Sequence, residues 1–318
     1  MAPPFDQIFP PSPTFTEKHA GDQGGRVFLV TGSTSGVGLE LAKMLYGLNG
    51  TVYVAGRSAE KISAAIKTIK KQVRTKTGRV EALQVDLANL PSIGQSARDF
   101  LSKEDRLDVL VHNAGLMTPP AGSKTDLGHD LEMGTNCLGP FLLNHFLEPT
   151  LKKTAAATNS PLGVRVVWLS SMIAASVPKG GITMNNDGSP KVIKNAMENY
   201  MQSKVGNVFL AIETARRLGK DGIINVSVNP GLLKTELQRH VSPIQRMIMG
   251  LMFKEPKYGA YTELFGCLSP EINSNKNGAF ILPWGRFGQI PDHIQQSIDN
   301  GKAASFYEWC DRETKEYQ

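Results

Sequence analysis

Short apolar runs, many of them β-branched, alternate with longer helical patterns from residue 26 onward. Seven runs read as strands, and they are Val27–Val30, Thr51–Ala55, Val80–Val85, Val109–Val111, Val164–Leu169, Ile223–Val228 and Ala279–Leu282. Between most of them, apolar residues recur at helical spacing, which predicts helices at Val37–Tyr46, Ala59–Val73, Ser92–Ser102, Leu131–Leu151 and Met197–Leu218. Strands that are apolar throughout and separated by helices indicate βαβ units. Right-handed crossovers then favour a single α/β domain, with a doubly wound parallel sheet and helices on both faces.

The two ends of the chain depart from this alternation. Residues 1–25 carry five of the 19 prolines and end in a Gly-rich stretch, which predicts a leader that is either extended on the surface or loose. We expect the sheet domain to span residues 26–290, with a substrate loop at 172–199 and a lid at 232–259. The tail, residues 291–318, contains Phe306, Tyr307 and Trp309, and we expect it to dock back on the domain.

Composition narrows the class of protein. A chain of 318 residues with 41% hydrophobic and 20% charged positions can bury a sizeable core, which excludes a disordered or fibrous protein. The three cysteines are far apart, and the first residues show neither the basic nor the apolar part of a secretion signal. No apolar run approaches the roughly 20 residues that span a bilayer. These features predict a cytoplasmic protein without a transmembrane segment.

The net charge of +6 has a local origin. Six basic and no acidic residues lie between Lys67 and Arg79, so the rest of the chain is neutral overall. No aromatic residue interleaves with them to stack on bases, and most of them share one face of a predicted helix. We interpret the run as a solvated helix face and expect no nucleic-acid partner. The six histidines lack the spacing of a zinc site, so we expect no metal either.

A Gly-rich segment joins the first strand to the first helix, and it reads TGSTSGVG from Thr31 to Gly38. In this position, glycines allow a tight turn and a close approach of the backbone to a pyrophosphate, while the helix N-terminus presents free N–H groups. A merely tight βα turn is the alternative. The context favours a Rossmann-type dinucleotide-binding fold, with a phosphate site made of Gly32, Ser33, Thr34, Ser35, Gly36, Val37 and Gly38.

The end of the second strand bears on which dinucleotide binds. Arg57 and Ser58 follow this strand, and Lys61 lies close behind. A carboxylate here would hold the ribose 2′-hydroxyl of NAD, whereas Arg57 can pair bidentately with a 2′-phosphate. The sequence therefore predicts NADP(H), unless Arg57 simply points to solvent. Other residues at carboxyl strand ends extend the expected cofactor site, and they are Asp86 and Leu87 at the adenine and Asn113, Ala114 and Gly115 at the ribose.

Tyr200 and Lys204 lie four positions apart, so they project from one face of a predicted helix. A tyrosine with an ordinary pKa of about 10 is a poor acid–base catalyst at neutral pH. We expect the ammonium of Lys204 and the positive nicotinamide of an oxidised cofactor to lower that pKa. Lys204 can also hydrogen-bond the nicotinamide ribose. Ser171, after the fifth strand, is expected to donate to a substrate carbonyl, while its neighbour Ser170 binds backbone.

Two further segments carry candidate residues. Asn136 stands within a predicted helix beside Gly and Pro, which is locally unfavourable and predicts a kink with a functional side chain. This side chain could hold a water that relays protons to Lys204. After the sixth strand, a tight turn is expected near the nicotinamide carboxamide, and its residues are Pro230, Gly231, Leu232 and Thr235.

Taken in order, these motifs resemble those of the short-chain dehydrogenase/reductase family, over roughly Arg26 to Gly288. The matching motifs are TGSTSGVG, Asp86, HNAG at His112–Gly115, Asn136, Ser170-Ser171, YMQSK at Tyr200–Lys204 and NPG at Asn229–Gly231. The resemblance implies a catalytic set of Ser171, Tyr200, Lys204 and Asn136, with Tyr200 and Lys204 also beside the cofactor. His112 replaces the first Asn of the family's usual NNAG, while Asn113 is retained.

The spacing of 29 positions from Ser171 to Tyr200 exceeds that of the commonest family members. In this respect the chain looks like the retinol-dehydrogenase-like branch and its fungal reductase relatives. The extra segment, Ala174–Asn199, should form a loop over the substrate mouth. Within the lid, Ile244–Phe253 carries three methionines, which would suit a bulky lipophilic substrate, a subunit contact or a membrane surface.

These residues predict an NADP(H)-dependent oxidoreductase that interconverts a carbonyl and an alcohol, with Tyr200 as general acid and base. Reduction of a lipophilic ketone or aldehyde is the expected direction, because cells generally keep their NADP pool reduced. Two alternatives stay open, namely a catalytically silent protein that senses NADP(H), and an epimerase or dehydratase built on the same site. The expected partner is a small molecule, and a homodimer fits as well.

Overall fold

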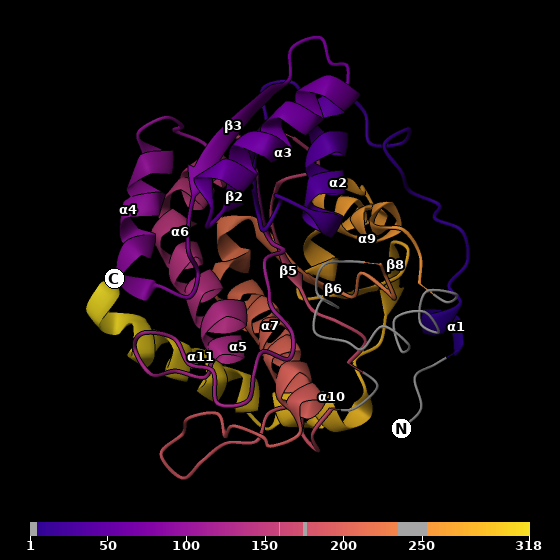
Figure 1. The fold of residues 1–318 in the computed structure, drawn as a ribbon. Helices are drawn as coiled ribbons and strands as arrows, with labels where there is room; N and C mark the ends of the chain where they lie inside the picture. The colour runs from indigo at the N-terminus through magenta and orange to yellow at the C-terminus, as the bar shows by residue number, and fades with distance from the viewer. Residues whose placement is uncertain (1–4, 159, 174–176, 235–252) are drawn as a thin grey trace.

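An eight-stranded sheet forms the centre of the molecule, with strands in the order β3-β2-β1-β4-β5-β6-β7-β8 (Figure 1). The computed structural model describes residues 5–158, 160–173, 177–234 and 253–318. The strands are β1 (Val27–Thr31), β2 (Thr51–Gly56), β3 (Arg79–Gln84), β4 (Val109–His112), β5 (Val164–Leu169), β6 (Ile223–Val228), β7 (Phe280–Leu282) and β8 (Arg286–Gly288). All neighbours pair in parallel except β7 and β8, which are antiparallel. The predicted doubly wound parallel sheet is confirmed, and β8 is an additional strand that the analysis of the sequence missed.

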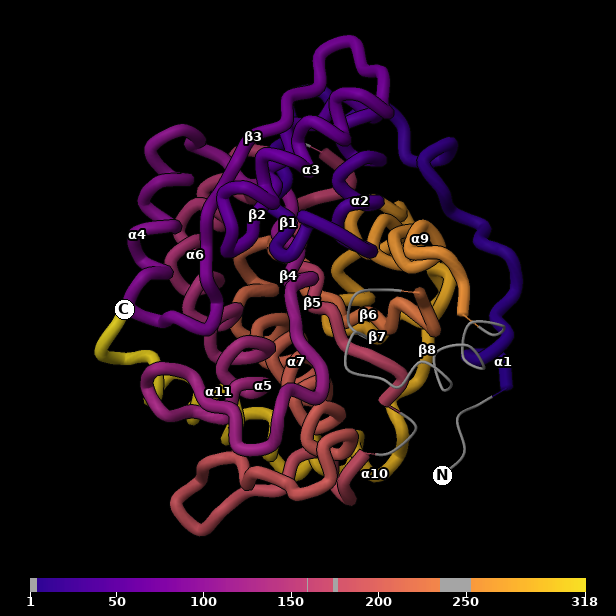
Figure 2. Tube along the Cα trace, in the orientation of Figure 1, coloured from indigo at the N-terminus to yellow at the C-terminus, as the bar shows by residue number. Residues whose placement is uncertain are grey.

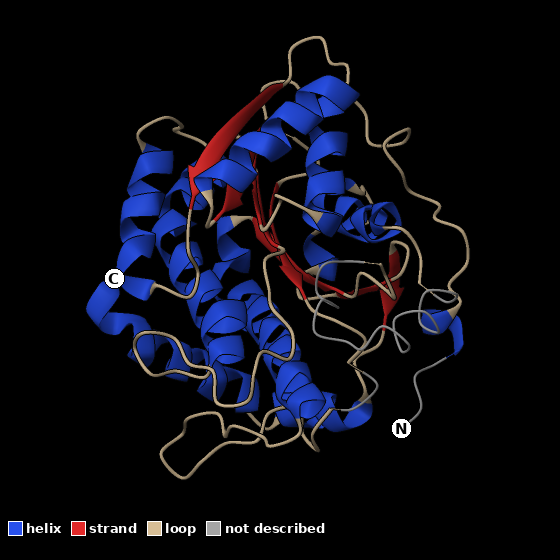
Figure 3. Cartoon of the chain, in the orientation of Figure 1, coloured by secondary structure: helices blue, strands red, loops and turns tan. Residues whose placement is uncertain are grey.

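Helices cover both faces of the sheet, as predicted, and Figure 3 shows the resulting three layers. One face packs against α2 (Gly36–Gly47), α3 (Ala59–Gln72) and α9 (Pro256–Leu268). The other face packs against α4 (Leu90–Leu101), α6 (Gly139–Ala157) and α7 (Ala196–Leu218), and α10 (Asp292–Asp299) and α11 (Lys302–Thr314) contribute to the same core. Between α4 and α6, α5 (Leu131–Met133) and a π-helical turn (Gly134–Leu138) replace the start of one predicted helix, Leu131–Leu151.

Strand β5 illustrates why the central strands are apolar, because all six of its residues are buried. Arg165 is the one charged residue of this strand, and it is fully buried as well. Its guanidinium donates to four backbone carbonyls, those of Leu162, Gly266, Ser269 and Ile272, at 2.9–3.3 Å. Burial lowers the pKa of Arg165 to about 10, and the four acceptors bind four of the five N–H donors of the guanidinium. Arg165 thereby joins β5 to the end of α9 and the loop after it.

Both chain ends lie against the sheet domain. In the tail, Phe306, Trp309 and Cys310 are buried in the core beside α7. In the leader, α1 (Phe5–Ile8) lies near the ends of β6 and β8 (Figure 1). The side chain of Gln7 is buried there and accepts a hydrogen bond from the Asn229 amide at 3.2 Å. Among the described residues, no helix is long and apolar enough to cross a membrane.

Of the region expected to be a lid, residues 232–259, the structure describes residues 232–234 and 253–259. The last of these residues form the start of α9, which packs against α2 and the sheet and continues to Leu268. This helix was not expected, because its apolar residues are interrupted by buried Thr262 and Glu263. The methionines of the expected lid and Thr235 lie outside the described residues.

Candidate active site

The candidate residues gather at the carboxyl edge of the parallel sheet. Strand order reverses between β1 and β4, and in such sheets ligands bind outside the carboxyl ends at the point of reversal. The Gly-rich turn follows β1 at this edge, and the predicted segments after β4, β5 and β6 lie along it (Figure 2). The structure therefore brings the expected cofactor residues and catalytic residues to one edge.

The Gly-rich turn has the geometry that a phosphate site needs. Gly32 and Gly36 have φ angles of +67° and +60°, a conformation that other residues rarely adopt. A Cβ on Gly32 would lie 2.8 Å from the Ala114 Cα, and one on Gly38 would overlap the Asn113 amide. Among the described residues, the side chain of Ser35 makes no capping hydrogen bond at the start of α2. The first N–H groups of this helix thus lack the usual side-chain acceptor, and an anion is the natural substitute.

Two of the predicted cofactor residues also support the turn. The buried Ser33 hydroxyl donates to the Val30 carbonyl at 2.7 Å and accepts from the Ala55 N–H at 3.1 Å. The Asn113 amide donates to the Thr31 carbonyl at 2.7 Å. This bond anchors Asn113 to the end of β1, and the place expected for Asn113, Ala114 and Gly115 beside the cofactor ribose stays a prediction. These bonds fix the turn between the ends of β1, β2 and β4.

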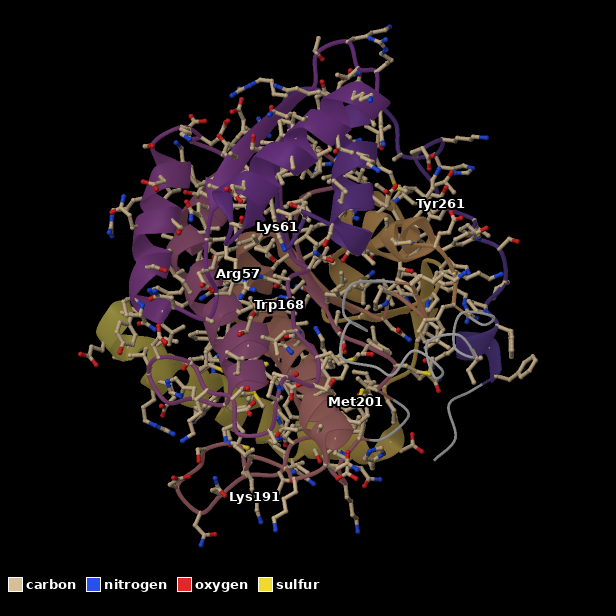
Figure 4. All side chains as sticks on the ribbon, in the orientation of Figure 1. Arg57, Lys61, Trp168, Lys191, Met201 and Tyr261 are labelled. Atoms are coloured by element: carbon tan, nitrogen blue, oxygen red, sulfur yellow. The ribbon has the colours of Figure 1, made fainter. Side chains whose placement is uncertain are left out.

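The residues expected to select the cofactor follow β2. Arg57 and Lys61 are exposed, and Figure 4 shows them close together at the start of α3. The Ser58 hydroxyl accepts from the Lys61 N–H at 3.3 Å and caps that helix. The candidate adenine residues follow β3, where Asp86 Oδ1 accepts from the Ala88 N–H at 3.0 Å. Leu87 is buried, and its carbonyl lies so close to Gly139 that no larger residue fits there.

Helix α7 carries Tyr200 and Lys204 on one face. The Lys204 Nζ lies 5.8 Å from the centre of the Tyr200 ring and donates to the Leu169 carbonyl at 3.0 Å. The Ser170 hydroxyl donates to the Lys204 carbonyl at 2.8 Å, in agreement with the structural role expected of it. Tyr200 and Lys204 are both buried, with 6% and 2% of their surface exposed. The end of β5 therefore holds α7 at the level of these two residues.

Burial dominates the electrostatics of this pair. It raises the pKa of Tyr200, and only a hydrogen bond with Ser171 opposes the rise. Burial also lowers the pKa of Lys204 to about 8, opposed by the nearby Cys137 and Glu132. In the protein without cofactor, desolvation of the phenolate therefore sets the direction of the shift. The phenol is thus held in its protonated form. The lowering that we expected from Lys204 together with the positive nicotinamide of an oxidised cofactor stays a prediction.

Asn136 lies in the π-helical turn, where a kink was expected. Its Oδ1 accepts from the Leu116 N–H at 2.9 Å, and its Nδ2 donates to the Leu116 carbonyl at 3.1 Å and to the Ser203 hydroxyl at 2.9 Å. Both amide hydrogens are used, so this side chain ties the loop after β4 to α7, and the water that we expected it to hold stays a prediction. A Cβ on Gly115 would lie 3.1 Å from both Asn136 Oδ1 and Lys204 Nζ. Glycine at this position lets the loop pass directly over the pair.

The turn after β6 is held from two distant parts of the chain. Asn229 Oδ1 accepts from the Gly231 N–H at 3.0 Å, and its Nδ2 donates to Gln7 of the leader. Gly231 has a φ of +83°, and a Cβ there would lie 2.7 Å from the Trp284 ring. Neither Gln7 nor Trp284 was expected here, since no local pattern links residues so far apart. Pro230 and Leu232 lie in the same turn, while Thr235 is outside the described residues.

His112, the departure from the family motif, lies at the end of β4. Its ring stacks on that of Trp168 in β5, with centroids 4.1 Å apart, and it is fully buried. Burial lowers its pKa to about 3, so the imidazole is neutral across the physiological range. His112 therefore fills the core below the site and is not an acid–base candidate.

The sequence matches the family described as short chain dehydrogenase over residues 26–245. A short-chain dehydrogenase/reductase of Pestalotiopsis fici, iacJ, is 42% identical over 321 aligned positions, which cover 98% of each chain. The chain therefore belongs to the short-chain dehydrogenase/reductase family, whose members are oxidoreductases that use nicotinamide cofactors. The resemblance seen in the motifs is confirmed.

Solved structures agree on the fold. An uncharacterised protein of Mycobacterium paratuberculosis superposes with a TM-score of 0.68 at 25% identity, over 95% of this chain and 97% of the other. L-sorbose reductase of Gluconobacter frateurii, solved with NADPH and L-sorbose, gives a TM-score of 0.63 at 19% identity, over 82% of this chain and 95% of the other. The likeness to the reductase concerns the fold alone.

Proposed function

We propose that the protein is an NADP(H)-dependent reductase of ketones or aldehydes, with Tyr200 as its general acid. One observation carries the proposal. Tyr200 lies between a serine that hydrogen-bonds it and a buried lysine within 5.8 Å of its ring, at the sheet edge that also carries the Gly-rich turn. A sensor without catalysis has no need of this arrangement.

The residues present fit a nicotinamide dinucleotide. The glycines of the turn leave room for a pyrophosphate, and the first N–H groups of α2 are available to it. Arg57, Ser58 and Lys61 offer a 2′-phosphate two cations and a hydroxyl, with no carboxylate from Gly56 to Ala59 to repel it. The solved reductase of the same fold, which was determined with NADPH, supports this choice of cofactor. When bound, NADPH supplies the hydride.

The chain's own residues then handle orientation and the proton. The Ser171 hydroxyl holds the substrate carbonyl beside the Tyr200 phenol. Tyr200 donates its proton to the carbonyl oxygen, and the raised pKa ensures that the proton is present at neutral pH. Lys204 stabilises the phenolate that remains and restores its proton, since a pKa of about 8 makes both of its charge states accessible. Asn136 holds α7 and the loop after β4 in register around this pair.

A lipophilic substrate is the second part of the proposal. It rests on the three methionines of residues 244–253, whose flexible side chains suit an apolar ligand. Acetophenone and decanal are therefore suitable first probes, one aromatic and one linear. An epimerase or dehydratase would bind NADPH without consuming it, so loss of NADPH absorbance with either probe separates the reductase from these relatives.

The first experiment is a titration of the purified protein with NADPH and with NADH, followed by Trp fluorescence or heat. We expect NADPH to bind more tightly by roughly tenfold or more, from one or more charge-assisted contacts to the 2′-phosphate. Preference for NADH would overturn the choice of cofactor and leave the oxidoreductase standing. Binding of neither would contradict the proposed function as a whole.

A further inference from the structure

Glu132 is a buried carboxylate with both oxygens bound by the protein. It lies in α5, directly before the π-helical turn, and only 2% of it is exposed. Its Oε1 accepts from the Thr118 N–H at 2.6 Å, and its Oε2 accepts from the Asn199 amide at 2.8 Å. Hydrogen bonds to a charged acceptor are shorter and stronger than neutral ones, especially away from water. Glu132 thus joins the loop after β4 to the residue that precedes Tyr200.

Asn199 and Gln202 carry this connection into the loop before α7. Asn199 Oδ1 accepts from the Ile193 N–H at 3.0 Å and from Gln202 Nε2 at 3.1 Å. Gln202 Nε2 also donates to the Lys191 carbonyl at 2.7 Å, and Figure 4 shows Lys191 in this loop near the start of α7. Three segments that are distant in the sequence therefore meet in one buried network.

The loop after β4 needs this support. Thr118 has a φ of +45°, a strained conformation that β-branched residues rarely adopt. Glu132 binds its N–H, and Asn136 binds Leu116 two residues earlier through both N–H and carbonyl. The surrounding bonds hold the strained residue in place. The loop, in turn, passes over Lys204 at Gly115.

We propose that Glu132 is a positioning residue that fixes the substrate side of the site. Through Asn199 it holds the first turn of α7, and hence Tyr200, against residues 116–118 and the loop at 183–193. The inference rests on the proposed function only in taking Tyr200 as the acid. Substrate geometry would then depend on Glu132, while the cofactor contacts at the Gly-rich turn and Arg57 would not.

The charge of Glu132 also acts on its neighbours. It faces Tyr200 and Lys204 on α7 and Asp130 on its own segment, and it contributes to raising the pKa of both Tyr200 and Lys204. Substitution of Glu132 by glutamine removes this charge. It also replaces one of the two carboxylate oxygens by an NH₂ group, so that either the Thr118 N–H or the Asn199 amide loses its acceptor. We therefore expect Glu132→Gln to break the network and to shift the pH profile of activity toward lower pH.

The decisive measurement is hydrogen exchange of the full protein without substrate. In Glu132→Gln and Asn199→Ala, we expect residues 116–118 and 183–193 to exchange roughly tenfold faster or more, while β1 and α2 keep their rates. Because both changes break one network, the double variant should exchange no faster than the worse single variant. Glu213→Gln is the matched control. Like Glu132, Glu213 is a buried glutamate, but it lies near the far end of α7, where it pairs with Arg216 at 2.6 Å.

Kinetics give the second readout. With acetophenone or decanal, we expect Glu132→Gln to lower kcat/KM roughly tenfold or more while the NADPH dissociation constant changes little. Wild-type exchange in both segments, or equal acceleration in Glu213→Gln, would overturn the positioning role. Failure of the wild-type protein to reduce any carbonyl would instead contradict the proposed function, and the exchange result would still decide the role of Glu132.

Discussion

The two halves of the sheet meet their tasks by different means. Strands β1–β4, with α2 to α4, follow a regular βαβ alternation and carry the residues that we propose bind the cofactor, as in the turn at Gly32–Gly38. The half with β5–β8 contains a long loop and an additional helix, α9, and its helix α7 carries Tyr200 and Lys204, which we propose as catalytic residues. Here Tyr200 and Lys204 are buried, and burial sets their pKa values. In the proposed function, cofactor binding thus depends on local chain geometry, and catalysis depends on contacts between distant segments.

Removal of the Tyr200 hydroxyl tests this separation most strongly. In Tyr200→Phe, we expect turnover with NADPH and a carbonyl probe to fall by roughly 10²- to 10⁴-fold, since the general acid is lost. NADPH affinity should stay close to wild type, because the cofactor is held mainly by the first half. Steady-state kinetics and an NADPH titration of the same preparation measure both. Turnover near that of the wild type would remove Tyr200 from its assigned role.

Arg57 offers the converse test in the first half. In Arg57→Ala, we expect NADPH affinity to fall roughly 10- to 100-fold with NADH affinity unchanged, because a charged hydrogen bond to the 2′-phosphate contributes about 1.5–3 kcal/mol. Turnover at saturating NADPH should hardly change. Arg74→Ala, which removes an exposed charge beyond α3, serves as the control. Equal losses for both cofactors would mean that Arg57 does not select between them.

Buried titratable groups in the two halves should change the free energy of unfolding with pH in opposite directions. Glu263 in α9 is fully buried, neither of its carboxyl oxygens has a hydrogen-bond partner among the described residues, and burial raises its pKa to about 8. From its ordinary value of 4.5 up to about pH 8, the folded state keeps a proton that the unfolded chain has released, so this group lowers the free energy of unfolding as pH rises. His112 in β4 acts in the reverse sense, because it stays neutral in the folded protein while the unfolded chain takes up a proton below about pH 6.5.

Glu263→Gln isolates the contribution of the second half. Glutamine stays neutral, so the variant should gain stability relative to wild type, by little near pH 5 and by more near pH 8. Urea denaturation at the two pH values measures the difference. A difference that is the same at both would show that Glu263 does not titrate in this range.

The smallest expected effect concerns the leader. Gln7→Ala removes the acceptor of the Asn229 amide, a neutral bond that contributes about 1 kcal/mol. We expect kcat/KM to fall by about two- to fivefold, because the turn at Pro230 and Gly231 becomes less well fixed. Gln295→Ala, in an exposed i,i+4 contact with Asp299, provides the comparison. If both variants match wild type, the leader does not support the site.

The sequence predicted β1 to β4 and α2 to α4 completely, whereas in the second half it predicted β5, β6, β7 and α7 but missed elements such as β8 and α9, for a physical reason. In β1 to β4 and α2 to α4, apolar periodicity and the turn chemistry are local, and the observed bounds differ from the expected ones by at most two residues. The short strand β8 has only three half-buried residues, too few to leave a pattern. In α9, buried polar residues hide the helical stripe.

The residues of the candidate site likewise fall into those that local motifs predicted and those that only the fold brings together. Tyr200, Lys204, Ser171 and Gly115 come together at the expected edge, because motif spacing reflects the strand ends that position them. Asn136 was expected from its unfavourable place in a helix, yet its partner Leu116 was not. Glu132 and Gln7 escaped notice altogether, since an isolated carboxylate or amide far from any motif carries no signal before the chain folds.

Arg165 has a consequence for how this protein tolerates change. Its four acceptors are main-chain carbonyls, which every amino acid supplies, so the identities of residues 162, 266, 269 and 272 can drift without costing the guanidinium a partner. Arg165 itself has no such freedom, because a lysine has no planar fork to reach carbonyls on two sides. This contact therefore requires one particular side chain, that of Arg165, while the four residues whose carbonyls it binds can be substituted without loss of the acceptors.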